Sequence, residues 1–343
     1  MLKRIQQRSK NQRLLIFIVV FVGIVLLLLI GATLLSLSAL NSGGRVEAQA
    51  LVPDVTVAQY AILPGDEAFP AALAVAPDAT VYTGSYLTGA LWSIDTDGAV
   101  VEIPATDVVL ASIVGLTFAQ DGTLYIVARN DPDPRTAGGS LQRLSADGVI
   151  SEYTSHAFVS PDDVAIDSQG SVYVSDRGSD EIWRFNVGGA DGFEWWTPPA
   201  LEGIEAYEPT GLAYDAANDA IIVTDPLANT IYRVPVESGE AELLYQHGDR
   251  QFPPGFDGVT VAADGTIYVA ALGQNGVVEL RDGELVYIAG NFRGASDVDL
   301  APDGRHLYVT NFDQSSIGQR YQFGTTITQP QLPFALDVVT LSS

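Results

Sequence analysis

The sequence contains an internal repeat of six copies. One position of this repeat carries an oxygen-bearing side chain in each of the last four copies. In chain order, the residues at this position are Ala71, Val114, Asp162, Thr210, Asp257 and Ser296. Ca²⁺ takes about six to eight oxygen ligands, which carboxylates completed by water can supply. We therefore predict one bound divalent cation, calcium in the first place and zinc or manganese as alternatives, with Asp162, Thr210 and Asp257 as metal ligands. Ser296 is predicted to be a ligand-binding hydroxyl beside them.

Two further side chains are candidates for contacting an organic ligand. His156 lies shortly before Asp162 on the same connection, and the other two histidines have no metal-binding spacing to it. Trp195 and Trp196 are adjacent, so a strand places them on opposite faces, one for packing and one for solvent. An exposed tryptophan beside a carboxylate can stack on a sugar ring, and Trp196 is the candidate for this role. Ordinary packing is the alternative for each of these side chains.

The composition excludes several other chemistries. The chain of 343 residues has a formal net charge of −25, no cysteine, and no lysine after Lys10. It therefore has no thiol nucleophile, disulfide or cysteine metal cluster, and its main body has no lysine for Schiff-base chemistry. Nucleic acid is excluded as a partner because phosphate binding needs a basic face. The acidity suits divalent cations or basic partners.

Short strands must position the candidate residues. From about residue 70 the sequence repeats an apolar strand, an Asp-Gly or equivalent turn, and a strand of the type x-Val-Tyr-Val-x-Asp, with no sustained helical periodicity. The anchor residues of this second strand are Tyr82, Tyr125, Tyr173, Ile222, Tyr268 and Tyr308. Six units of about four strands, recurring roughly every 40–50 residues, predict an all-β, six-bladed β-propeller. The segments 54–63 and 335–341 are predicted to complete the last blade.

In such a ring the innermost strands begin at the central channel, which is where the six positions of the first paragraph are expected to meet. The sequence resembles the calcium-dependent six-bladed propellers of the senescence-marker-protein/gluconolactonase/luciferin-regenerating-enzyme family, which includes regucalcin, and the neighbouring NHL-repeat proteins. The resemblance covers roughly residues 66 to 315 and is closest from Phe256 to Leu280. The segment from Val172 to Phe185 is similar to an NHL blade.

The gluconolactonase resemblance implies a metal shell of one glutamate, middle-blade asparagines and an aspartate in a Pro-Asp-Gly turn. Asp257 matches this aspartate, whereas Asp162 and Thr210 stand where asparagines are expected. The glutamate is absent, because Ala68-Phe69-Pro70 occupies the place of the family's Glu-Gly-Pro, with Glu67 only nearby. A metal-dependent hydrolase needs a charge-dense shell around its ion, so this departure disfavours the lactonase activity that the resemblance implies.

The N-terminus predicts a membrane anchor. Residues 1–13 are basic and are expected to stay in the cytoplasm, and residues 14–38 are predicted to form one transmembrane signal anchor. A flexible linker is expected over 39–53 and the propeller over 54–343. The propeller then lies outside the cytoplasm, in an extracellular or periplasmic space. The alternative is secretion after cleavage near Ala50, where Ala48-Gln49-Ala50 fits a small-x-small site.

Three functions follow from these observations. The first is a ligand-binding or scaffold propeller that takes a small-molecule or protein ligand at one face and holds a divalent cation in its channel. The second is a metal-dependent sugar-lactone or ester hydrolase of the gluconolactonase type. The third is a protein-interaction module that uses an acidic face. The fold alone does not select among them, because propellers host unrelated functions.

Overall fold

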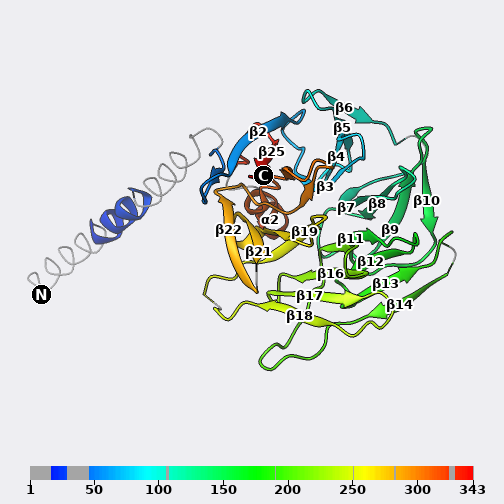
Figure 1. Cartoon of the computed structure of the whole chain (residues 1–343). Helices are drawn as coiled ribbons and strands as arrows, with labels where there is room; N and C mark the ends of the chain where they lie inside the picture. Colours follow the sequence, from blue (N-terminus) through cyan, green and yellow to red (C-terminus); the bar gives the residue numbers. More distant parts are fainter. Residues whose placement is uncertain are drawn as a thin grey trace, which may run out of the picture.

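The structure is a computed structural model, which describes residues 17–28, 46–105, 108–189, 191–249, 251–281, 283–323 and 329–342. Within these ranges six antiparallel sheets are arranged in a ring (Figure 1). Five sheets have four strands and one has five. The predicted six-bladed β-propeller is confirmed.

Each blade runs from an inner strand at the channel to an outer strand at the rim. Blade one contains β3 (Pro70–Val75), β4 (Val81–Ser85), β5 (Leu91–Ile94) and β6 (Val100–Ile103). Blade two contains β7 (Ser112–Phe118), β8 (Leu124–Arg129), β9 (Gly139–Leu144) and β10 (Ile150–Thr154). Blade three contains β11 (Pro161–Ile166), β12 (Val172–Asp176), β13 (Glu181–Phe185) and β14 (Gly192–Trp196).

The second half of the ring repeats this order. Blade four contains β15 (Leu212–Asp215), β16 (Ala220–Asp225), β17 (Thr230–Pro235) and β18 (Glu242–Gln246). Blade five contains β19 (Phe256–Val261), β20 (Ile267–Ala271), β21 (Gly276–Arg281) and β22 (Glu284–Gly290), with a short 3₁₀ helix at Leu272–Gln274. Blade six contains β23 (Val298–Leu300), β24 (His306–Val309), β25 (Ala335–Thr340) and β2 (Thr56–Ile62).

The last blade closes the ring with strands from both ends of the domain. β2 pairs antiparallel with β25, from Thr56 opposite Thr340 to Ile62 opposite Ala335. β25 in turn pairs with β24. The predicted closure by segments 54–63 and 335–341 is thereby confirmed. Closure lets blade six pack against blade one, so that neither blade leaves a hydrophobic face exposed at a gap in the ring.

Part of the segment expected to be a linker is attached to blade five. β1 (Gln49–Ala50) pairs with the outer strand β22, and Leu51 N donates to Ile288 O over 2.9 Å. Just before it, Val46 N donates to the Gln331 side chain over 2.8 Å. The linker therefore contains an edge strand, and the small-x-small sequence ending at Ala50 overlaps it.

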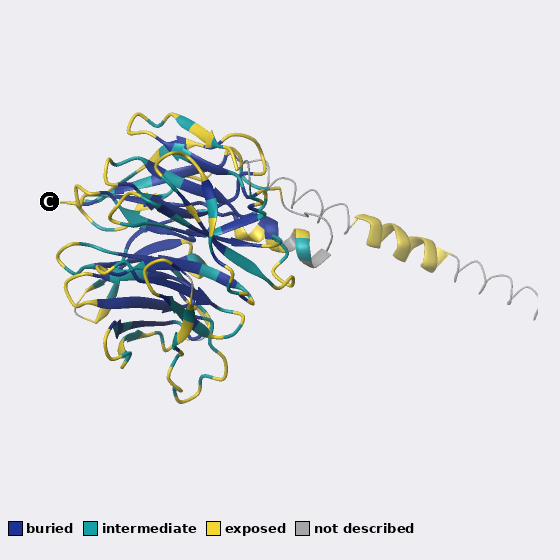
Figure 2. Ribbon diagram, turned by 90° about the vertical axis from the view of Figure 1, so that its right-hand side faces the viewer, coloured by how far each residue is buried: buried dark blue, intermediate teal, exposed yellow. Residues whose placement is uncertain are grey.

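The blades are held together by apolar side chains between neighbouring sheets. Six buried clusters occur in the described chain, and each draws residues from two adjacent blades. Tyr173 of blade three, for example, lies in one cluster with Tyr232 of blade four, and both are at most 1% exposed. Figure 2 shows this burial in the strands, with the exposed residues in the loops. Because each blade is hydrophobic on both faces, it is stable only between its neighbours.

Bulges in the inner strands aim their first residues at the axis. Each of β3, β7, β11 and β19 shifts register against its second strand, at Pro70/Ala72, Ile113/Gly115, Pro161/Val164 and Phe256/Val259. A bulge sets extra residues of one strand opposite the partner and re-aims their side chains. Ala71, Val114, Asp162 and Asp257 all lie inside these bulges. The register break is thus the local reason why the predicted positions face the channel.

The inner strands approach one another closely at glycines, which gives a stability prediction. A Cβ on Gly211 would lie 2.2 Å from the main-chain oxygen of Asp257 in the next blade. We expect Gly211→Ala to lower the free energy of unfolding in urea by about 3 kcal/mol, because backbone must move to relieve the overlap. Gly248→Ala is the control, since no described atom lies within 4 Å of its Cβ. Equal stability of the two variants would contradict the prediction.

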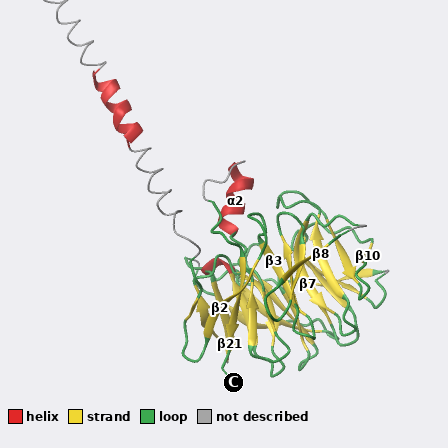
Figure 3. Cartoon of the chain, turned by 90° about the horizontal axis from the view of Figure 1, so that it is seen from above, coloured by secondary structure: helices red, strands yellow, loops and turns green. Residues whose placement is uncertain are grey.

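In the described ranges, two α-helices lie outside the blades. α2 (Gln314–Phe323), inserted between β24 and β25, was not expected from the sequence, which lacks helical periodicity there. It stands on one face of the ring, and the C-terminus lies at the opposite face (Figure 3). Residues 17–28 form a helix with exposed side chains. No helix in the described ranges is both long and apolar enough to cross a bilayer, and the rest of the predicted 14–38 anchor lies outside those ranges.

Candidate functional site

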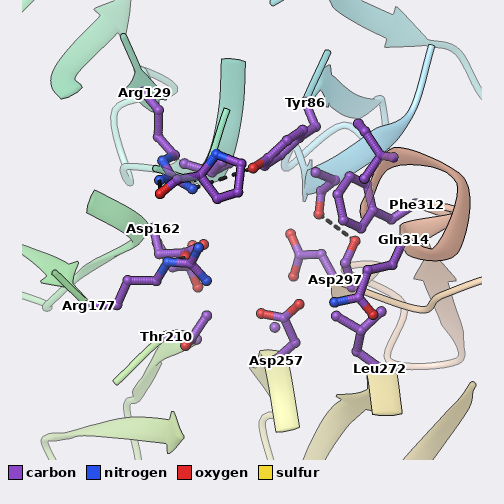
Figure 4. A pocket seen from close by; sticks show the side chains of 18 of the residues that line it. Tyr86, Arg129, Asp162, Arg177, Thr210, Asp257, Leu272, Asp297, Phe312 and Gln314 are labelled. Atoms are coloured by element: carbon purple, nitrogen blue, oxygen red, sulfur yellow. Dashed lines mark hydrogen bonds and ion pairs between the residues drawn. The ribbon is translucent and has the colours of Figure 1, made fainter. Parts of the chain in front are cut away.

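A cavity of about 200 Å³ lies at the mouth of the central channel, under α2. Its lining includes all six of the positions that the sequence predicted to meet: Ala71, Val114, Asp162, Thr210, Asp257 and Ser296. The structure therefore brings these side chains together, and Figure 4 shows several of them around the cavity. Their predicted roles in binding metal or ligand remain predictions.

A second position of the repeat also contributes side chains to this cavity. The residues four places beyond each anchor of the second strand are Tyr86, Arg129, Arg177, Pro226, Leu272 and Phe312, and all except Pro226 line the same cavity. Each lies at the end of the second strand of its blade or up to three residues beyond it. The repeat thus contributes two side chains from most blades, one at the inner-strand bulge and one above it. The sequence analysis did not predict this second set of lining residues, although they recur at one position of the repeat.

The floor of the cavity is acidic. The carboxylates of Asp257 and Asp297 point toward the same region in Figure 4. Burial, together with the nearby Asp162 carboxylate, raises the pKa of Asp257 well above its usual range. Asp297 is 8% exposed and accepts hydrogen bonds from Leu73 N (2.7 Å) and Val298 N (2.8 Å). Burial also raises the pKa of Asp297.

Arg177 provides a positive charge inside this acidic floor. Its Nε lies 2.9 Å from Asp162 Oδ2, and its Nη1 lies 3.2 Å from Glu208 Oε1. The side chains of Arg177 and Asp162 are only 25% and 15% exposed, so the pair is shielded from bulk water. The Asp162 carboxylate raises the pKa of Arg177, and the arginine remains charged. Asp162 is therefore already neutralised by a protein cation.

The side chains present do not fit the divalent cation that the resemblance implies. The guanidinium Nε of Arg177 lies 2.9 Å from Asp162 Oδ2, so this oxygen already has a cationic partner. The Thr210 hydroxyl donates to Glu208 O, and the Ser296 hydroxyl donates to Ala71 O, each over 2.8 Å. Within the described ranges, no group of three or more histidine, aspartate or glutamate side chains is arranged to hold a metal. The geometry instead suits a ligand that forms hydrogen bonds.

Apolar side chains form the wall on the α2 side. Phe312 and Ile317 are 8% and 4% exposed, and both line the cavity with Leu272 and Tyr321. Tyr86 packs edge-on against Phe312, with ring centroids 4.9 Å apart. The cavity thus combines an apolar wall with a polar floor, which is the usual composition of a small-molecule site. α2, which the sequence did not predict, supplies much of this wall.

The structure places two sequence candidates away from the cavity. His156 packs on Trp183, with ring centroids 3.9 Å apart, and on the neighbouring Phe158. Burial lowers the pKa of His156, as expected for a ring enclosed by aromatic neighbours. Trp196 is 6% exposed and packs edge-on against Tyr232 in the core between blades three and four. The structure therefore brings neither residue to the channel cavity.

The fold and this site define the class as a six-bladed β-propeller with a ligand-sized cavity at its channel mouth. The chain is similar in structure to virginiamycin B lyase from Staphylococcus aureus, with a TM-score of 0.58, 15% identity, and 84% of this chain and 100% of that chain covered. It is also similar to a gluconolactonase from Xanthomonas campestris, with a TM-score of 0.60, 15% identity and coverage of 86% and 95%.

A putative gluconolactonase gives a TM-score of 0.59 at 18% identity, with 85% of this chain and 97% of that chain covered. No protein-family profile and no curated protein matches the sequence. The gluconolactonase-like propeller expected from the sequence is therefore confirmed as a fold. At these identities the likeness concerns the fold alone.

Proposed function

We propose that this protein is a propeller that binds a small organic molecule in the cavity under α2, anchored to a membrane with its propeller outside the cytoplasm. The observation that carries the proposal is the lining of this one cavity. Apolar side chains of Phe312, Ile317 and Leu272 form one wall, and charged side chains including Asp257 and Arg177 form the rest. The uncharged run beginning at Leu14 supports the anchor.

The size of the cavity limits the ligand. A cavity of about 150 Å³ inside a protein admits benzene, so one of about 200 Å³ suits a single ring with one or two substituents. Solved propellers of this fold include gluconolactonases and a lyase determined with quinupristin, which supports a small-molecule role for the fold. We favour binding over metal-dependent hydrolysis because Arg177, and not a free carboxylate, faces Asp162.

Binding is tested with the full chain in detergent and four small probes: benzoate, benzyl alcohol, gluconate and glucose. We expect at least one probe to raise the unfolding temperature in a saturable way, because a ligand that binds only the folded state stabilises it. Gly318 lines the cavity from α2, and no described atom lies within 4 Å of a Cβ placed there. We expect Gly318→Trp to fold normally and to abolish this shift.

Gly248→Trp is the matched control, because Gly248 is a similarly unhindered glycine outside the cavity lining. It is expected to keep the probe-dependent shift. Absence of a shift with all four probes would overturn the proposed function. An equal shift in the Gly318→Trp and Gly248→Trp variants would show that the probe binds elsewhere, and would overturn it as well.

A further inference from the structure

Arg129 is a buried cation in the cavity wall whose hydrogen bonds are incomplete. It is 2% exposed and is the last residue of β8, the second strand of blade two. Its Nη1 lies 3.5 Å from the Tyr86 hydroxyl, and its Nη2 donates to Pro134 O over 3.2 Å. Its Nε has no hydrogen-bond partner among the described residues. Buried charged groups are normally paired, so this arrangement calls for a partner.

The carboxylates around Arg129 are engaged elsewhere. Asp133, on the loop after β8, forms an ion pair with Arg135, with 2.6 Å between Oδ2 and Nη2. Glu208 forms an ion pair with Arg177, with 3.2 Å between Oε1 and Nη1. No ion pair to Arg129 is formed within the part of the chain that the structure describes. An anionic partner of Arg129 would therefore lie in the cavity.

Blades two and three differ in the residue that could form an ion pair with this arginine, and Arg129 has no such pair among the described residues. Arg129 and Arg177 occupy the same position of the repeat, four residues beyond the anchors Tyr125 and Tyr173. In blade three the inner-strand bulge presents Asp162, which pairs with Arg177 at 2.9 Å. In blade two the equivalent bulge residue is Val114, which carries no charge. Arg177 therefore has an internal counter-ion at this repeat position, whereas Arg129 does not.

We propose that Arg129 binds the carboxylate of a small organic acid, whose body lies against the apolar wall of Phe312 and Ile317. This inference rests on the proposed function and names its ligand class. A carboxylate fits better than a phosphate, because one guanidinium matches one negative charge and the floor beyond it is acidic. Arginine binds carboxylates with charge-assisted hydrogen bonds, which are about twice as strong as neutral ones.

The wild-type chain tests the charge requirement first. We expect benzoate to bind at least about tenfold more tightly than its neutral analogue benzyl alcohol, measured by calorimetry on the full chain in detergent. Equal affinity, or tighter binding of the alcohol, would overturn the carboxylate inference and leave the proposed function standing. Binding of neither benzoate nor benzyl alcohol, nor of gluconate or glucose, would overturn both.

A carboxylate introduced beside Arg129 tests whether this residue binds the ligand. Val114→Asp copies the Asp162–Arg177 pair into blade two and neutralises Arg129 without removing it. We expect this variant to weaken benzoate binding at least about tenfold more than Val114→Asn, which has nearly the same shape and no charge. The affinity for benzyl alcohol should differ much less between the two variants. Similar benzoate affinities for Val114→Asp and Val114→Asn would overturn the assignment of Arg129.

Discussion

Replacing Arg177 by glutamine is expected to lower the free energy of unfolding by about 3 kcal/mol. The substitution leaves Asp162, which lines the cavity, and Glu208 without their counter-ion, which in the wild type lies 2.9 and 3.2 Å from them. Breaking a shielded pair costs more than the pair contributes, because the remaining charge stays desolvated. Urea unfolding of the full chain in detergent at neutral pH measures the effect.

Arg135→Gln provides the control, because Arg135 is 72% exposed in its pair with Asp133. A surface pair of this kind contributes about 0–1 kcal/mol, so little change is expected. Adding Asp162→Asn to Arg177→Gln should recover part of the loss. A loss in Arg177→Gln no larger than that in Arg135→Gln would show that the cavity is well solvated and would contradict the prediction.

The same variant tests the calcium that the sequence predicts. While Arg177 pairs with Asp162, we expect no saturable stabilisation of the wild-type chain by calcium, zinc or manganese. In Arg177→Gln the carboxylates of Asp162 and Glu208 lose their internal cation, so calcium should stabilise this variant more than the wild type. Saturable stabilisation of the wild type by one of these ions would restore the sequence-based metal site.

The stability of the propeller is expected to fall as the pH rises from about 5 to about 9, by an amount on the order of 3 kcal/mol. Burial raises the pKa of Asp163 to about 8, and it also raises the pKa of Asp297 and of Asp299. These groups bind protons more tightly in the folded state than in the unfolded chain. Unfolding therefore releases protons, and its free energy decreases with pH through this range.

Asp297→Asn separates this effect from general sensitivity to pH. The variant is expected to lose stability, because Asp297 accepts hydrogen bonds from both Leu73 N and Val298 N. Its pH profile between 5 and 9 should nevertheless be flatter than that of the wild type. Asp303→Asn is the control, because Asp303 is exposed and its hydrogen-bonding partners Arg305 and His306 help to lower its pKa. Stability that rises with pH in the wild type would contradict the assignment.

The repeat made much of the site predictable. Strand alternation and Asp-Gly turns are local signals, and equivalent residues of a ring must meet at its axis. Asp162, Thr210, Asp257 and Ser296 therefore meet as predicted. The same repeat contains the second set of lining residues, including Arg129 and Arg177, but a pattern of oxygen-bearing side chains does not select them. Arginines at a channel position were the available signal.

Other features of the molecule could not be predicted from local sequence patterns. His156 and Trp196 pack in aromatic clusters whose partners, such as Trp183 and Tyr232, lie on other strands. Exposure of a ring depends on these distant neighbours, so residue type and strand position did not determine it. The helix α2 is stabilised by contacts, with Ile317 buried against the core, and not by a repeating apolar stripe. Its place over the cavity was therefore unpredictable from periodicity.

By itself, the sequence determined the six-bladed ring, its closure by β2 and β25, and which residues face the channel, because each follows from a period or a local turn. Only the tertiary structure decided the charge state of the site. Whether Asp162 is a free ligand or half of an ion pair depends on where the Arg177 side chain lies, and the repeat does not specify this. The same holds for Arg129, because only the folded chain shows that its buried Nε has no hydrogen-bond partner among the described residues.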